Sequence, residues 1–236
     1  SKWVSAAEAA NEFLTNPAFN YSFDPEYYNS NNMSRGVFNN RKSKELIFER
    51  RQGNSFSFEK ANFPKGFDEA NGNATCPSQN LVDAYQTTDG YDVVLDSNGQ
   101  WSDPMNPYDK RDPRLLQTIL VNGKKWKGTT VETFNGGAHG FPLADATPTG
   151  YYLQKHVRQD IDIAGSNAAP KEHVWVLFRL AEIYLNLAEA MNEAFGPNEL
   201  PDGYIMDAVT AINVVRTRAA VDMPPISDVT TDELRS

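Results

Sequence analysis

Three things are scarce in this sequence: cysteine, positive charge and long apolar runs. The single cysteine, Cys76, has no partner in the chain for a disulfide, and it excludes a zinc site built from several cysteines. Lysine and arginine number 22 against 31 aspartate and glutamate, so the formal net charge is -9. Such a chain lacks the basic face that nucleic acids and anionic lipids require. No apolar run approaches the ~18 residues that span a bilayer.

The sequence also lacks the short motifs of the common enzyme classes. It contains no P-loop, no G-x-S-x-G, no H-E-x-x-H and no C-x-x-C. The glycine-rich segment 136–140 has the wrong spacing for a phosphate loop, and the histidines, at positions 139, 156 and 173, lie far apart in the sequence. We therefore predict a protein that is not an enzyme and that has no cofactor and no metal site.

One alternative to the absence of metal is a calcium site. Asp96, Asn98 and Asp103 surround Gly99 and offer the oxygen ligands that calcium prefers. The segment lacks the ligand spacing and the closing glutamate of an EF-hand. A plain turn is therefore the favoured interpretation of these residues.

The composition is that of a globular protein. Of the 236 residues, 40% are hydrophobic and 22% are charged, which allows a real core without disulfides or metals. The chain does not begin with Met, and no signal peptide opens it, because a helical pattern is already present at Trp3. We interpret the chain as a piece of a longer protein and expect it to carry no targeting segment itself.

Three regions of different character follow one another. Residues 1–16 contain a short helix, over 2–15, that Asn16-Pro17 ends. Residues 17–170 are rich in Asn, Gly, Pro and aromatics, which predicts a loop-rich region, and loops this long are usually functional or belong to a larger assembly. Residues 171–236 are strongly helical at first. The predicted fold is mainly α, with tetratricopeptide-like helix pairs and a long loop-rich region that contains short β-hairpins.

The helical region shows the clearest periodicity. Apolar side chains recur at steps of three and four residues at Leu177, Leu180, Tyr184, Leu187 and Met191. This spacing predicts one helix over 174–194, which Gly196-Pro197 ends. A second helix is expected over 205–219. The two helices resemble one unit of a tetratricopeptide-like array, with the start of the next element behind it, and residues 1–16 are expected to end another such unit upstream.

Short strands are expected in the loop-rich region. Leu46 to Phe48 indicate one strand, and the segment 151–157 alternates weakly. Asn122-Gly123 supplies the backbone conformation of a tight turn, so we expect residues 115–121 and 124–126 to pair as a hairpin around it.

Aromatic and amide side chains offer the remaining chemistry. Aromatic rings stack on the apolar faces of sugars, while Asn, Gln and Asp side chains bond their hydroxyl groups. The candidate ligand-binding residues are Tyr91, Asp96, Asn98, Gln100, Trp101, Tyr108 and Trp126. For each ring the alternative is ordinary core packing, which is the default for buried aromatics.

Several segments resemble the SusD/RagB family of outer-membrane nutrient-binding lipoproteins. They occur in the order KELIFE (44–49), PSQNLVDAY (77–85), RDPRL (111–115), FRLAEIYLNLAEA (178–190) and AINVVRTRA (211–219). Most of their charged residues suit structural roles. Arg179, for instance, can form ion pairs with neighbouring elements, and Arg216 suits the end of a helix, where cations interact favourably with the dipole.

The resemblance implies a fold, in which residues 17–170 form the loop-rich region that binds the ligand, and it also implies a function. Members of the family are surface-exposed lipoproteins of the cell outer membrane, where they bind oligosaccharides and deliver them to a SusC-type TonB-dependent transporter without catalysis. We therefore expect a glycan ligand, this transporter as partner, no nucleic acid, and membrane contact only through a lipid anchor outside this chain. Two alternatives stay open: a peptide-binding uptake protein of the RagB kind, and a helical-repeat scaffold that docks onto the transporter with little ligand affinity.

Overall fold

The computed structural model describes residues 1–25, 36–67, 70, 72, 74–95, 101, 105 and 107–235. The chain divides into two compact units. The first unit comprises Ser1–Pro25, Arg41–Glu49 and Val176–Ser236, and the second comprises Glu26–Asn40 and Arg50–Trp175. The three-region division of the sequence stays a prediction.

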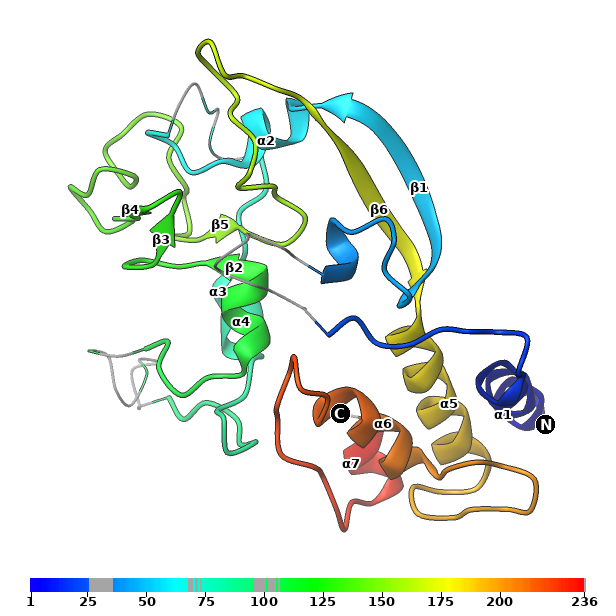
Figure 1. The fold of residues 1–236 in the computed structure, drawn as a ribbon. Coiled ribbons are helices and arrows are strands. Elements are labelled where there is room, and N and C mark those ends of the chain that lie inside the picture. Colours follow the sequence, from blue (N-terminus) through cyan, green and yellow to red (C-terminus); the bar gives the residue numbers. More distant parts are fainter. Residues whose placement is uncertain are drawn as a thin grey trace. The chain divides into compact units, whose positions relative to one another are not determined.

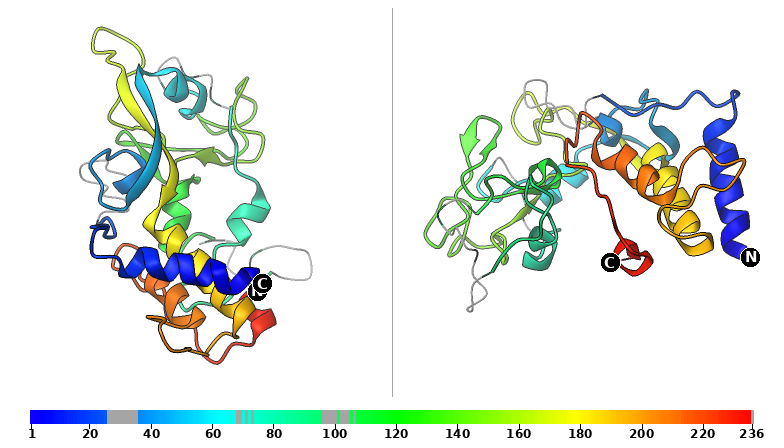
Figure 2. Two further views of the ribbon diagram at one scale, coloured as in Figure 1. Left: turned by 90° about the vertical axis from the view of Figure 1, so that its right-hand side faces the viewer. Right: turned by 90° about the horizontal axis from the view of Figure 1, so that it is seen from below.

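The first unit is built around one central helix. Helix α5 (Leu180–Ala194) contacts α1 (Lys2–Thr15), α6 (Ala208–Arg216) and α7 (Thr231–Arg235). Figures 1 and 2 show α5 between α1 and α6. The fully or nearly fully buried residues of this packing are Ala7, Ala10, Leu187, Ala188, Ala190, Met191, Ala208 and Ala211. The many alanines allow the helix backbones to approach closely. The contact between α5 and α6 confirms the predicted pair of packed helices.

Local sequence signals set the ends of these helices. Ser1 caps α1, and Asn16 ends it in an extended conformation because the following Pro17 disfavours the helical one. Gly196 ends α5 with a φ of +103°, a conformation that residues with a side chain rarely adopt. Asp207 accepts a hydrogen bond from the Thr210 N–H and starts α6. The second predicted helix is therefore shorter than the 205–219 expected.

The helix predicted over 174–194 is wrong in its first part. Residues Lys171–Arg179 form strand β6, which pairs with β1 (Leu46–Ser55), and α5 starts only at Leu180 (Figure 1). Leu177 lies in the strand and is half exposed. The run from Val174 to Val176 contains the β-branched and aromatic residues that favour strands, and pairing with β1 satisfies its backbone groups.

One buried carboxylate joins three segments of the first unit. Glu45 is fully buried, and its Oε1 accepts hydrogen bonds from Arg179 Nη1 at 2.6 Å and Arg218 Nη1 at 3.1 Å. Its Oε2 accepts a bond from the Asp24 N–H at 3.1 Å. The guanidinium of Arg218 also lies 4.9 Å from the ring centroid of Phe23. The arginines of the family-like segments 178–190 and 211–219 thus meet the glutamate of segment 44–49.

Apart from the parts of β1 and β6 that belong to it, the second unit consists of short elements and long loops. Its helices are η1 (Gly36–Phe38), α2 (Ser57–Asn62), α3 (Gln79–Asp83) and α4 (Pro113–Thr118). Strand β2 (Ile119–Leu120) pairs antiparallel with β5 (Tyr152–Leu153), and β3 (Lys125–Trp126) pairs antiparallel with β4 (Thr129–Thr130).

The expected hairpin around Asn122-Gly123 is present only as a turn. The Lys124 N–H donates to the Val121 carbonyl across it, and Gly123 has a φ of +81°. The strands on its two sides do not pair with each other, because β2 takes β5 as its partner and β3 takes β4. The residues before β2 form α4, started by the side chain of Asp112 with Pro113 in the first turn.

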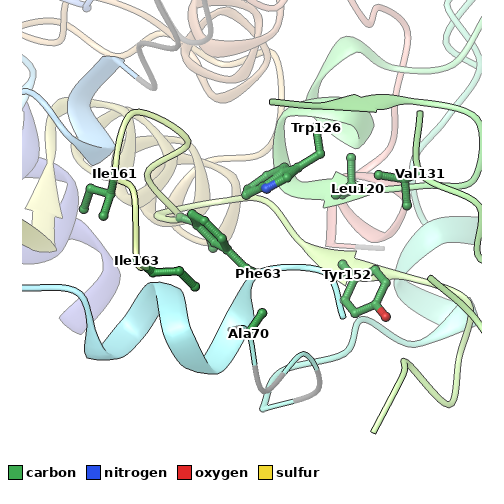
Figure 3. Packing of buried hydrophobic residues seen from close by; sticks show 9 residues of the cluster. Phe63, Ala70, Leu120, Trp126, Val131, Tyr152, Ile161 and Ile163 are labelled. Atoms are coloured by element: carbon green, nitrogen blue, oxygen red, sulfur yellow. The ribbon is translucent and has the colours of Figure 1, made fainter. Parts of the chain in front are cut away.

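Buried aromatic rings hold the second unit together. Trp126 and Phe63 pack edge to face with ring centroids 5.2 Å apart. Figure 3 shows them with Ala70, Leu120, Val131, Tyr152, Ile161 and Ile163, and Val157 completes the buried cluster. These residues come from loops as well as from strands. The core of this unit is therefore formed largely by a few large rings and not by the faces of regular helices and strands.

Candidate functional site

Helix α3 supplies the support for the predicted ligand-binding segment. Ser78 caps the helix by accepting a hydrogen bond from the Leu81 N–H, and Val82 is buried in the core below it. Asp83, in the last turn of α3, accepts a hydrogen bond from Gln79 Nε2 at 2.8 Å. The carboxylate of Asp83 is therefore held at the end of a short but anchored helix.

Trp101 is hydrogen-bonded to this carboxylate. Its indole N–H donates to Asp83 Oδ1 at 2.9 Å, and its backbone forms an isolated bridge with Leu95. The Tyr108 ring packs against it edge to face, with centroids 5.5 Å apart. The guanidinium carbon of Arg111 lies 6.0 Å from the Trp101 ring centroid. Trp101 remains partly exposed, so it combines a fixed position with an accessible surface.

Arg111 ties the segment to α3. Its guanidinium donates to the carbonyls of Val82, Tyr85 and Pro107, at distances from 2.6 to 3.1 Å. The side chain is almost fully buried, and this burial lowers the pKa of Arg111, while the nearby Asp83 carboxylate acts in the opposite direction. Arg111 thus acts as an anchor beneath the rings.

A groove opens beside Tyr108. It has a volume of about 490 Å³, and its lining residues are Met105, Pro107, Tyr108, Asp109, Asn122, Gly123 and Lys124. The turn at Asn122-Gly123 forms one wall, and the Asn122 side chain is oriented by the bond that its Oδ1 accepts from the Thr133 N–H at 2.9 Å. The groove combines one aromatic ring with an amide, a carboxylate and an ammonium group.

Burial shifts the pKa of two phenols at the site. It raises the pKa of Tyr108, against the opposing effect of a hydrogen bond with Tyr151. It also raises the pKa of Tyr151, whose ring packs edge to face on Tyr108 with centroids 6.4 Å apart. Of these two residues, Tyr108 lines the groove, and a phenol hydroxyl can both donate and accept hydrogen bonds, which suits a ligand that carries hydroxyl groups.

The other predicted site residues differ in where the structure places them. Tyr91 is 74% exposed, and its backbone bonds Thr87 in the loop that leads to Leu95. Trp126 is fully buried in the aromatic core, so it has no free face for a ligand and we remove it from the site. The candidate residues Asp96, Asn98 and Gln100, and the calcium alternative that includes Asp103, lie outside the described residues.

Sequence reasoning missed the residues that support the rings. Gln79, Asp83 and Arg111 lie in segments to which the sequence assigns structural roles, and Tyr151 lies in a segment expected to form a strand. One signal points to them: a partly buried indole N–H needs an acceptor, and Asp83 is an acidic residue in a nearby segment. The sequence offers several other carboxylates, so only the structure identifies the partner.

No metal site emerges from the part of the chain that the structure describes. There, no group of three or more His, Cys, Asp or Glu side chains is arranged to hold an ion. Over the same residues, none of the helices has the length and apolar character needed to cross a membrane.

Comparison with protein families gives a clear match. The model of the SusD family matches residues 18–235. The chain belongs to the SusD family. The expected mainly α, SusD-like fold with short β-hairpins is thereby confirmed, as is the resemblance of its segments.

Solved structures share the fold. A SusD-like carbohydrate binding protein from Bacteroides fragilis matches with a TM-score of 0.72 and 24% identity, over 99% of this chain and 44% of that one. A SusD superfamily protein from Bacteroides vulgatus matches with a TM-score of 0.60 and 16% identity, over 99% of this chain and 43% of that one. This chain therefore spans less than half the length of these structures. No curated protein matches the sequence.

Proposed function

We propose that this member of the SusD family binds oligosaccharides or polysaccharides without altering them. The observation that carries the proposal is the Trp101–Tyr108 pair beside the groove. Stacking rings next to an amide, a carboxylate and hydroxyl groups match the alternation of apolar faces and hydroxyls on a sugar. The carbohydrate binding of the Bacteroides fragilis relative supports the same ligand class.

We further propose where this binding acts. Family membership supports a parent protein on the surface of the outer membrane, attached through a lipid anchor outside this chain. The ligand would pass to a SusC-type TonB-dependent transporter. Formation of a stable complex with such a transporter, in a co-purification from outer membranes, tests this part separately from glycan binding.

Substitution of the exposed rings tests the glycan site. We expect Trp101→Ala to weaken polysaccharide binding by about 1–3 kcal/mol, the range for one stacking ring by analogy with bases. Tyr91→Ala should have a smaller effect, because no contact with Trp101 or Tyr108 holds its ring in the described structure. The measurement is retardation in native affinity gels that contain soluble starch, laminarin, galactomannan or pectin.

The control is another exposed ring of the same unit. Phe134 is 55% exposed and lies outside the site, so Phe134→Ala should migrate like the wild type. Equal retardation of Trp101→Ala and wild type on every polysaccharide that the wild type binds would refute the site. Peptides that co-purify with the protein, detected by mass spectrometry, would instead support the RagB-like alternative, and reducing ends released on long incubation would support an enzyme.

A further inference from the structure

A chain of hydrogen bonds runs from the core to Trp101. The Tyr151 hydroxyl donates to Gln79 Oε1 at 2.8 Å, Gln79 Nε2 donates to Asp83 Oδ1 at 2.8 Å, and Trp101 Nε1 donates to the same oxygen at 2.9 Å. At one end, Tyr151 is only 4% exposed. At the other, Trp101 is partly exposed beside Tyr108. The two ends are therefore coupled through a single carboxylate oxygen.

The geometry points to Asp83 as a positioning residue: we propose that it fixes the orientation of the Trp101 ring in which the ring meets a sugar. The inference rests on the proposed glycan-binding function. An indole has a single N–H, so the position of its acceptor selects one orientation of the ring. The acceptor itself cannot drift, because Gln79 bonds it from one turn below in the same helix.

Arg111 limits the ring from a second direction. Its guanidinium lies over the Trp101 ring and is fixed by bonds to three backbone carbonyls. The N–H edge of the ring is bonded to Asp83, and one face lies toward Arg111. A ligand can therefore reach only the rest of the ring surface. This arrangement would favour ligands that reach the ring from one side.

Fixing the ring before binding raises affinity. A free side chain must be immobilised when a ligand binds, at a cost that lowers affinity by about 2- to 12-fold. A ring held by Asp83 has already lost that freedom on folding. Loss of the Asp83 acceptor should therefore weaken glycan binding although Asp83 itself touches no ligand.

The test compares three variants of the full chain labelled with ¹⁵N-tryptophan. The four tryptophans give four indole N–H signals, and Trp101→Phe identifies the signal of Trp101. In Asp83→Ala, we expect this signal to shift and its hydrogen exchange to quicken about 12- to 150-fold, the range for one hydrogen bond to a charged acceptor. In Asp83→Asn, which keeps an oxygen acceptor but loses the charge, the signal and the exchange rate should change less than in Asp83→Ala.

Gel retardation on the polysaccharide that retards the wild type most provides the second readout. Asp83→Ala should bind severalfold more weakly, and Asp83→Asn should restore most of the affinity. If Asp83→Ala does not fold, Gln79→Leu removes the link to Tyr151 and should give a smaller change of the same kind. Asp92→Ala is the matched control, because the exposed Asp92 carboxylate also accepts a bond from a glutamine amide, Gln86 Nε2 at 3.2 Å.

The outcomes separate this inference from the proposed function. An unchanged Trp101 signal and exchange rate in Asp83→Ala would overturn the positioning role, whatever the glycan result. A second outcome is that Asp83→Ala changes the Trp101 signal but is retarded like the wild type, while Trp101→Ala loses retardation. This result would show that positioning of the ring has no part in binding. Wild-type retardation of Trp101→Ala would overturn the proposed function and, with it, this inference.

Discussion

The two units of this protein are stabilised by different means. In the first, helices α1, α5 and α6 pack along apolar stripes, and one buried carboxylate, Glu45, binds two arginines. In the second, loops surround buried rings such as Trp126, and short strands of two residues add few backbone bonds. The comparison teaches that regular helices spread stability over many small contacts, whereas a loop-rich unit concentrates it in a few large side chains.

The largest expected effect is at the centre of the second unit. Trp126→Ala removes a fully buried ring and its contact with Phe63, so we expect unfolding to become easier by about 3–5 kcal/mol. Urea denaturation gives the magnitude, and hydrogen exchange by mass spectrometry localises it to residues of the second unit. Trp126→Phe, which keeps a ring, should cost clearly less. A loss spread evenly over both units would contradict the comparison.

A smaller effect is expected at the buried carboxylate of the first unit. Glu45→Gln keeps the shape of the side chain but removes the negative charge that Arg179 and Arg218 contact at this position. We expect a loss of about 1.5–3 kcal/mol, typical of hydrogen bonds to charged groups. Glu189→Gln, on the exposed side of α5, serves as the control and should stay within about 0.5 kcal/mol of the wild type. Equal stability of the two variants would show that packing alone holds this unit.

The smallest predicted effect is a pH dependence confined to the second unit. Burial, with a further contribution from the Lys155 charge, lowers the pKa of His156 from 6.5 to about 4. Between these two pH values, the His156 ring is therefore protonated in the unfolded chain and neutral in the folded protein. Stability from the neutral ring is complete above about pH 6.5 and declines as the pH falls toward 4, by up to about 2 kcal/mol for this partly exposed ring.

Denaturation at several pH values measures this dependence. His156→Asn should flatten the curve between pH 6.5 and 4, because asparagine does not titrate there and tolerates the positive φ of 67° at this position. An identical curve for variant and wild type would assign the acid sensitivity to other groups.

Helix ends were predicted from the sequence more accurately than strand partners, for a physical reason. Helix boundaries depend on nearby residues, and Asn16-Pro17 and Gly196 mark the ends of α1 and α5 as expected. Strand partners depend on residues far away in the sequence. The periodicity of Leu177 with Leu180 therefore suggested a helix where β6 pairs with β1, and the turn at Asn122-Gly123 suggested a pairing that does not form.

The candidate site shows the same division. Composition and order indicated a segment in which Trp101 and Tyr108 lie together, and the structure brings these two rings into contact. It also places Trp126, another candidate ring by sequence, inside the core. Nothing local distinguishes these two tryptophans, because exposure is decided by what packs against each ring.

By itself the sequence determined α1 and most of α5 and α6, the acidic and cysteine-poor character of the chain, and its membership of the SusD family, because these depend on local patterns and on the order of segments. The tertiary structure alone decided that Glu45 binds Arg179 and Arg218, that β6 pairs with β1, and that Asp83 accepts the Trp101 indole N–H. Each of these joins groups distant in the chain, and a hydrogen bond or an ion pair requires a distance of a few ångströms that only the folded backbone sets.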